Sequence, residues 1–373
     1  MPHGESHFIY LSIPFADYHS YDNGMDFGYH NKYSKRLLHE DQRSPLAVFY
    51  NLVNEEQLLK LFPTHPPYHR FREFIAPHAD RFKILKTILE ELAINHQVVS
   101  IAGNRHFLVF PDMQKQTKWP DIENLLCGPE LLRYSLLKNN MLRDREAILL
   151  VAHYDRVAHS PGANDNSAAV FELINAALIL QREDIRHWFM IFTDKEELDE
   201  GEGLCTQGAY TLAKGLKDAK FGSPKVFIFD ACGSGDTLII STVADLLTKN
   251  DERAGSSRIR HAVQQLRQRA LETARTMHLE CCMIMPTPFS DDAGFFRANL
   301  AAQTITMLPS TEATACASLF RNKPDIIALL ISGDKSILPE TWRRLNTSND
   351  AFSYLTPQYF PTVVRFVCAL CGA

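Results

Sequence analysis

The stretch Ala147–Leu180 reads AILLVAHYDRVAHSPGANDNSAAVFELINAALIL, and the rest of the chain is organised around it. It opens on an apolar run, residues 148–152, which is typical of a fully buried strand. The strand ends on His153 and Asp155, a loop follows that contains Asp165, and residues 168–180 have the apolar periodicity of a helix. Open α/β sheets place their sites between the end of a buried strand and the next helix. The residues therefore predict a metal centre, in which Asp155 orients the imidazole of His153.

Two later segments repeat this design. Residues 187–192 are a second apolar strand, which leads to Glu196 and Glu197, and residues 225–229 are a third, which ends on Asp230. An imidazole and several carboxylates suit zinc or another divalent cation. One glutamate of the adjacent pair can bind the metal while the other acts as a general base.

Composition narrows the class of protein. The 373 residues carry a formal net charge of −5, from 39 basic and 44 acidic side chains, which argues against a nucleic-acid partner. The sequence has no apolar run of membrane-spanning length, and its first residues lack the pattern of a secretory signal. We therefore expect no membrane partner, a cytoplasmic location and eight reduced cysteines. The sequence does not predict the oligomeric state.

These strand-end motifs resemble those of metallopeptidase family 28, in clan MH, which contains aminopeptidases, glutamate carboxypeptidases and glutaminyl cyclases. The family's first motif is an apolar strand with His-x-Asp and then Gly-Ala-x-Asp-Asn-x-Ser, here VAHYD and GANDNSA. The second leads from a strand to Glu-Glu and a glycine-rich turn, here FMIFTDKEELDEGEGLCTQGAY. The third is an Asp at a strand end followed by Gly, here IFDACG. The resemblance runs from about Arg72 to the C-terminus, about four-fifths of the chain.

The resemblance implies a role for each of these residues. His153 and Asp230 would bind one metal, Asp165 would bridge two, and Glu197 would bind the other. Glu196 would be the general base, and Asp155 would support His153. In the segment Ser290–Phe295, SDDAGF, the resemblance implies that Asp291 contacts the general base or the substrate.

Two histidines of the family pattern are absent from this chain. The last ligand is a His in a His-Thr-x-x-Asp segment, and here Asn346 occupies that place in NTSND. An amide oxygen is a weaker zinc ligand than an imidazole and suits harder cations. The other departure is Asp292, which stands where the family has a His after Ser-Asp.

The expected fold is α/β, with three α/β/α layers and a mixed, mostly parallel central sheet, as in zinc exopeptidases. We expect a helix over residues 78–92, entered at Pro77, and a hairpin over residues 97–110, with less regular structure over 112–144. A long helix over 258–278 is expected at the surface, and His106 at a strand edge or turn. Residues 71–373 would form the catalytic domain, and residues 1–70 an extension packing on it. A second interpretation has this extension cap the site, with His19 or His30 replacing the missing ligand.

The resemblance implies a metal-dependent exopeptidase of aminopeptidase type that acts on a peptide or a small amino-acid-derived substrate. Its cofactor would be one or two zinc ions, or another divalent cation. A glutaminyl cyclase-like acyltransferase is an alternative, although its single zinc would need the position that Asn346 occupies. A third interpretation is a catalytically impaired pseudo-peptidase that acts as a binding module, because of Asn346 and Asp292.

Overall fold

The computed structural model describes residues 66–111, 123–198, 202–222, 224–245, 256–323, 329–330 and 334–372. Nearly all of the expected N-terminal extension, including His19 and His30, lies outside these residues, so both interpretations of it stay predictions. Tyr68 is described, and its ring packs in the core against Phe171 and Phe360.

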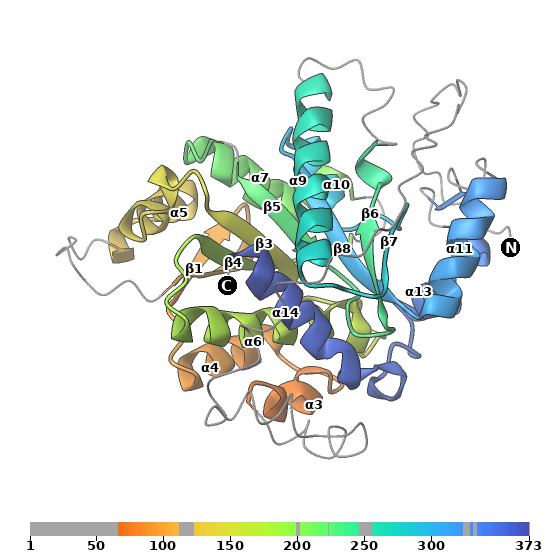
Figure 1. Ribbon diagram of the computed structural model, residues 1–373. Helices are drawn as coiled ribbons and strands as arrows, with labels where there is room; N and C mark the ends of the chain where they lie inside the picture. Colours follow the sequence, from red (N-terminus) through yellow and green to blue (C-terminus); the bar gives the residue numbers. More distant parts are fainter. Residues whose placement is uncertain are drawn as a thin grey trace, which may run out of the picture. The chain divides into compact units, whose positions relative to one another are not determined.

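The described residues form an eight-stranded sheet in the order β1-β2-β4-β3-β5-β8-β6-β7 (Figure 1). The strands are β1 (His96–Ile101), β2 (Asn104–Val109), β3 (Ile148–His153), β4 (Trp188–Thr193), β5 (Lys225–Phe229), β6 (Thr237–Ser241), β7 (Cys282–Met285) and β8 (Ala302–Leu308). Strands β4, β3, β5 and β8 run parallel, and so do β6 and β7. The pairs β1–β2, β2–β4 and β6–β8 are antiparallel. The expected mixed, mostly parallel sheet is therefore confirmed.

Both faces of the central strands are buried, which explains their continuous apolar sequences. In β3, Ile148, Leu150 and Ala152 join the core on one face, and Leu149 and Val151 join the core on the other. The period-two alternation of a strand therefore places every side chain of this run in a core.

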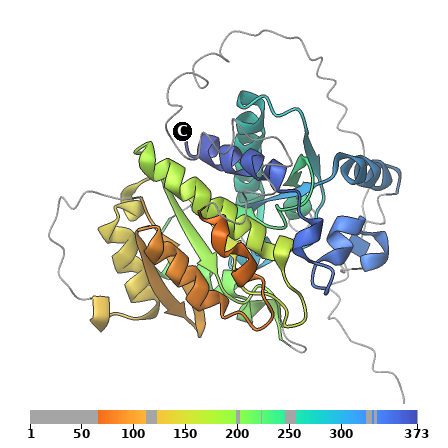
Figure 2. The ribbon, with the colours of Figure 1, turned by 90° about the horizontal axis from the view of Figure 1, so that it is seen from below.

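Helices form a layer on each face (Figures 1 and 2). The first layer contains α3 (Phe71–Phe74), α4 (Arg81–Glu91), α6 (Ala169–Arg182), α9 (Ser256–Thr276) and α14 (Phe360–Leu370). The second contains α5 (Gly128–Lys138), α7 (Gly208–Asp218), α10 (Asp292–Arg297) and, over β6 and β8, α11 (Ser310–Asn322), with the short α13 (Glu340–Arg344) beside it. This arrangement confirms the expected α/β/α layers. Within the described ranges, no helix combines the length and the apolar character that a bilayer crossing requires.

Several local expectations were wrong. Helix α5 lies inside the segment expected to be irregular, because Leu131, Leu132 and Leu136 give it one buried face. Helix α4 begins at Arg81, since the carboxylate of Asp80 accepts the Lys83 N–H as an N-cap.

Two placements also differ from expectation. Helix α9 is not simply a surface helix, because Val263, Leu266 and Ala270 are buried on one side of it. His106 lies within β2 and is fully buried.

Candidate metal centre

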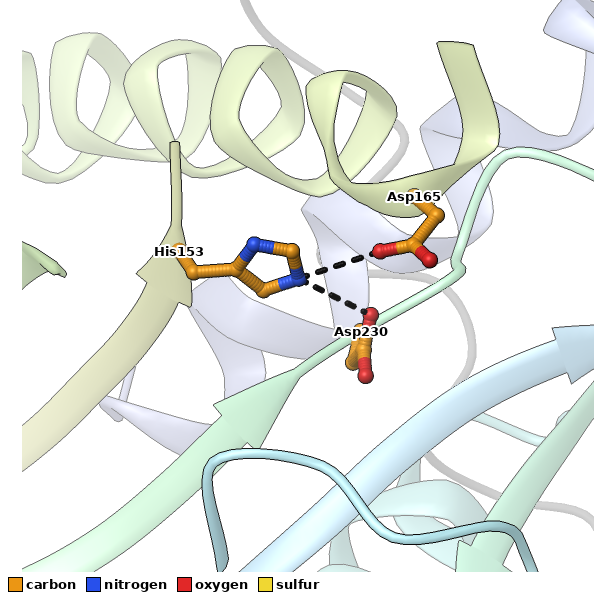
Figure 3. Close-up of side chains that lie close together, drawn as sticks. All are labelled: His153, Asp165 and Asp230. Atoms are coloured by element: carbon orange, nitrogen blue, oxygen red, sulfur yellow. Dashed lines mark ion pairs between the residues drawn. The ribbon is translucent and has the colours of Figure 1, made fainter. Parts of the chain in front are cut away.

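Three side chains converge at the carboxyl ends of the parallel strands β3 and β5 (Figure 3). His153 is the last residue of β3, Asp165 lies in the turn before α6, and Asp230 follows β5. The Nε2 atom of His153 lies 3.1 Å from Oδ1 of Asp165 and 3.6 Å from Oδ1 of Asp230. One ligand atom of each residue lies within 4.8 Å of the other two.

The spacing and chemistry of this trio fit a divalent metal ion. Zinc–ligand bonds of about 2.0–2.2 Å place two tetrahedral ligand atoms roughly 3.3 Å apart, which lies between the two distances from His153. The ring of His153 is 1% exposed, so the trio is largely shielded from bulk water. Both ring nitrogens of His153 and Oδ1 of Asp230 are buried without a hydrogen-bond partner that meets standard geometry among the described residues. Buried polar atoms are normally paired, so a cation would supply the missing partner.

A wide turn with π-type hydrogen bonding, Ala163–Ala168, presents Asp165 to the other two residues. Asp350 holds this turn from the other end of the sequence. Its Oδ1 accepts the Asn164 N–H at 2.8 Å, and its Oδ2 accepts the Asp165 N–H at 3.0 Å. Asp350 is the acidic residue of the NTSND segment, so that segment positions Asp165 through the backbone.

The loop between β3 and the turn is held by Arg81 of α4. The guanidinium is 5% exposed and donates to the backbone carbonyls of Tyr154, Asp155, Pro161 and Gly162 at 2.7–3.1 Å. It also donates to Oγ of Ser167 at 2.8 Å. One side chain therefore fixes both ends of the segment that separates His153 from Asp165.

Asp155 connects the metal centre to Glu196. Its Oδ1 lies 3.4 Å from Nδ1 of His153, on the ring edge opposite the trio. Both of its carboxylate oxygens accept the backbone N–H of Glu196 at 3.0 Å. Asp155 therefore lies beside the ring that it is expected to support, and the same carboxylate holds the backbone of the predicted general base.

The other side of Glu196 is held by Gln207, whose Nε2 donates to the Glu196 carbonyl at 3.2 Å. The next residue, Gly208, lies close to the backbone of Asp194, where a Cβ atom would come within 1.6 Å of the carbonyl oxygen. Only a glycine leaves room for the two segments to pack this closely. Backbone groups on both sides of the Glu196 side chain are therefore fixed.

The centre opens into a cleft of about 190 Å³. Its acidic floor consists of Asp165, Glu196, Glu197 and Asp230, and Asn346 borders the same cleft. The side-chain amide of Asn346 donates to Oε1 of Glu197. Of the predicted site residues, the structure thus places five in the cleft lining and puts His153 and Asp155 directly behind it.

The sequence profile of peptidase family M28 matches residues 136–359, which is more than half of the chain. The chain belongs to this family. The resemblance inferred from its motifs is therefore confirmed. A search of curated proteins finds no match to the chain.

Solved structures of two kinds of enzyme resemble the chain. The LapA aminopeptidase of Legionella pneumophila is 14% identical, with a TM-score of 0.49 over 92% of this chain and 79% of that one. A glutaminyl cyclase of Porphyromonas gingivalis is 14% identical, with a TM-score of 0.47 over 80% and 94%. BSAP, a zinc aminopeptidase from Bacillus subtilis, is 15% identical, with a TM-score of 0.42 over 71% and 48%, so this chain spans about half of its length.

The family segment Ser290–Phe295 borders the cleft through Ser290, whereas Asp291 is not part of the cleft lining. Asp291 is fully buried at the start of α10, and neither of its oxygens has a hydrogen-bond partner among the described residues. Asp291 therefore makes no hydrogen bond to Glu196 here, and its contact with the general base or the substrate stays a prediction. Asp292, in place of the family His, accepts the Ser290 N–H at 3.2 Å, which gives it a local structural partner.

Burial and mutual repulsion raise the pKa values of several of these carboxyl groups. Burial raises the pKa of Glu196 well above its usual range, and the charges of Glu197, Asp165 and Asp230 add to the rise. Burial also raises the pKa of Asp291 to about 8, that of Asp292 to about 7 and that of Asp350 to about 7. For His153, burial opposes protonation, but Asp155, Asp165 and Asp230 outweigh it and raise the pKa. A divalent cation would offset this concentration of negative charge.

We expect Asp155→Asn to weaken zinc binding by about 10–100-fold, the usual cost of altering a group that orients a ligating histidine. The amide is neutral and its oxygen is a weaker acceptor than a carboxylate oxygen, so it supports the His153 ring and holds the Glu196 N–H less strongly. Zinc affinity should be measured by competition with a chromogenic chelator. Asp184→Asn, an exposed aspartate paired with Arg186, is the matched control. Wild-type affinity in Asp155→Asn would show that Asp155 does not orient His153.

Three positioning residues were missed in the sequence. Asp350 is the last residue of the NTSND motif, so this motif could have marked Asp350 as a site residue. Arg81 and Gln207 bind backbone carbonyls, and no pattern of neighbouring residue types marks such contacts.

Proposed function

We propose that the chain is a metal-dependent exopeptidase of aminopeptidase type. The observation that supports this most strongly is the convergence of His153, Asp165 and Asp230, of which Asp165 and Asp230 line the same cleft as Glu196. Membership of peptidase family M28 supports a peptidase, and the small cleft suits the end of a peptide better than the middle of a folded chain.

In this proposal His153, Asp165 and Asp230 hold a zinc ion. When bound, the ion polarises the scissile carbonyl and makes a water molecule easier to deprotonate. The Glu196 carboxylate accepts a proton from the attacking water and returns it to the leaving amine. Asp155 and Gln207 keep the Glu196 backbone in place for both transfers, at the N–H and at the carbonyl respectively.

The test uses peptides of one sequence with free and with acetylated N-termini, incubated with zinc-reconstituted protein and followed by mass spectrometry. We expect removal of the first residue from the free peptide only, and loss of the activity on addition of a chelator. Ammonia loss from glutaminyl peptides would instead indicate a cyclase. Bound zinc with neither reaction would contradict the proposal and favour a binding module.

We expect Asn346→His to raise the zinc content from about one ion per chain toward about two, because an imidazole nitrogen is a zinc ligand and an amide nitrogen is not. In the structure the Asn346 amide donates to Oε1 of Glu197, so this carboxylate oxygen is engaged by a side chain. Elemental analysis after zinc dialysis measures the change, with Asn349→His, three residues along on an exposed position, as the control. An unchanged zinc content in Asn346→His would show that Asn346 is not the reason why the second zinc site is missing.

A further inference from the structure

We propose that Lys335 makes the cleft selective for substrates that carry a carboxylate group close to the scissile bond. The inference rests on the proposed peptidase function and adds the substrate class to it. It starts from one feature of the cleft lining, in which Lys335 is the single cationic side chain among sixteen described residues.

Lys335 lies on the same wall of the cleft as Asn346. It begins a short 3₁₀ turn, Lys335–Ile337, and its Nζ donates to the carbonyl of Leu345 at 3.3 Å. Leu345 directly precedes Asn346, whose amide contacts Glu197. The ammonium group is therefore anchored near the Glu197 side of the acidic floor.

No acidic side chain of the described residues is bonded directly to the Lys335 ammonium group. The nearest acidic neighbour in sequence, Asp334, uses Oδ1 to cap the Ser336 N–H at 2.8 Å. Within the described ranges, Lys335 forms no ion pair. A lysine ammonium has three donors, so one bond to Leu345 leaves two for a ligand.

The rest of the cleft complements a ligand with an apolar stem and an anionic end. The cleft lining also contains Pro288, Phe289, Leu338 and Trp342, which supply apolar surface. A carboxylate is the anionic group that peptides offer, and a charge-assisted bond to an ammonium is stronger than a bond between neutral groups. Two sources fit this chemistry, namely the acidic side chain of an N-terminal residue and the terminal carboxylate of a dipeptide.

Calorimetric binding to zinc-loaded Glu196→Gln protein separates these sources without turnover. One pair of ligands is Glu-Ala-Ala-amide and Gln-Ala-Ala-amide, and the other is Leu-Gly and Leu-Gly-amide. In at least one pair, we expect the member with the extra carboxylate to bind about tenfold more tightly or better, the range for a hydrogen bond to a charged partner. Adding Lys335→Gln should remove that difference, while Lys214→Gln, on an exposed lysine of α7 outside the cleft, should keep it.

A preference that survives Lys335→Gln, or no carboxylate preference in either pair, would overturn the inference. Hydrolysis of both pairs by the wild-type protein without a preference would leave the peptidase function intact and refute the role of Lys335. If the carboxylate preference in binding depends on Lys335 but none of the four peptides is hydrolysed, the proposed peptidase function is refuted and the carboxylate site is supported.

Discussion

Glu196→Gln should lower kcat for peptide hydrolysis by about 10²–10⁴-fold, the usual contribution of a general base, and should leave the zinc content unchanged. Glutamine keeps the size of the side chain but cannot accept a proton from water at neutral pH. The backbone contacts that Asp155 and Gln207 make to residue 196 do not involve its side chain, so the site should keep its shape. Steady-state kinetics on the zinc-loaded protein, with elemental analysis of the same sample, measure both quantities.

The matched control for this prediction is Glu202→Gln. Glu202 follows Glu196 in the same loop and pairs with Lys195 at 2.6 Å, but it does not line the cleft. Loss of this partly exposed ion pair should change kcat by no more than about twofold, since such pairs contribute about 0–1 kcal/mol. Equal activity of Glu196→Gln and wild type would exclude Glu196 as the base, and zinc loss in Glu196→Gln would mean that Glu196 acts as a ligand.

Arg81→Met should lower the free energy of unfolding by about 3 kcal/mol or more, because each buried acceptor left without a donor costs about 1–3 kcal/mol. The guanidinium serves four carbonyls in the loop between His153 and Asp165 and the hydroxyl of Ser167 just after it, and its Nε donates to the Phe74 carbonyl at 3.3 Å. Methionine fills the space but provides no donor. The loop should loosen, so zinc affinity should fall together with stability.

Urea unfolding and zinc titration test this prediction, with Lys83→Met as a control on the same helix. Lys83 is 79% exposed and pairs only with Asp80 in the described structure, so its loss should be nearly neutral. If Arg81→Met does not fold, Arg81→Lys keeps the charge and provides a milder variant, which should still lose zinc affinity. Wild-type stability and zinc affinity in both variants would show that Arg81 does not hold the loop.

The convergence of the main candidate ligands could be predicted because the sheet geometry is regular. Parallel strands end at one edge, so polar residues that directly follow buried strands meet there, as His153 and Asp230 do. The place of Asp165 in the loop after the first strand makes it a candidate, and the family resemblance implies its role as the bridging ligand. Family membership confirms the resemblance, although the roles assigned to individual residues stay predictions.

Other features depend on contacts that the sequence pattern does not record. Arg81 looks like one more basic residue of a helix, and only the fold brings backbone carbonyls to it from residues 154–162. The apolar face of helix α5 is too short to stand out in the sequence. The helix is stabilised by its packing against α7 and β1, which the sequence pattern does not show. Lys335 lies outside every motif, and its place in the cleft follows from its bond to the Leu345 carbonyl.

The most direct test of the account is the zinc content per chain, measured by elemental analysis after zinc reconstitution and dialysis, in wild type and in Asp165→Ala. The central claim is that His153, Asp165 and Asp230 form the metal centre on which the activity depends. We expect about one zinc ion per chain in the wild-type protein and the loss of most of this zinc in Asp165→Ala. A site with three protein ligands loses much of its zinc affinity when one ligand is removed. A wild-type protein without zinc, or equal zinc in the two proteins, would contradict the claim.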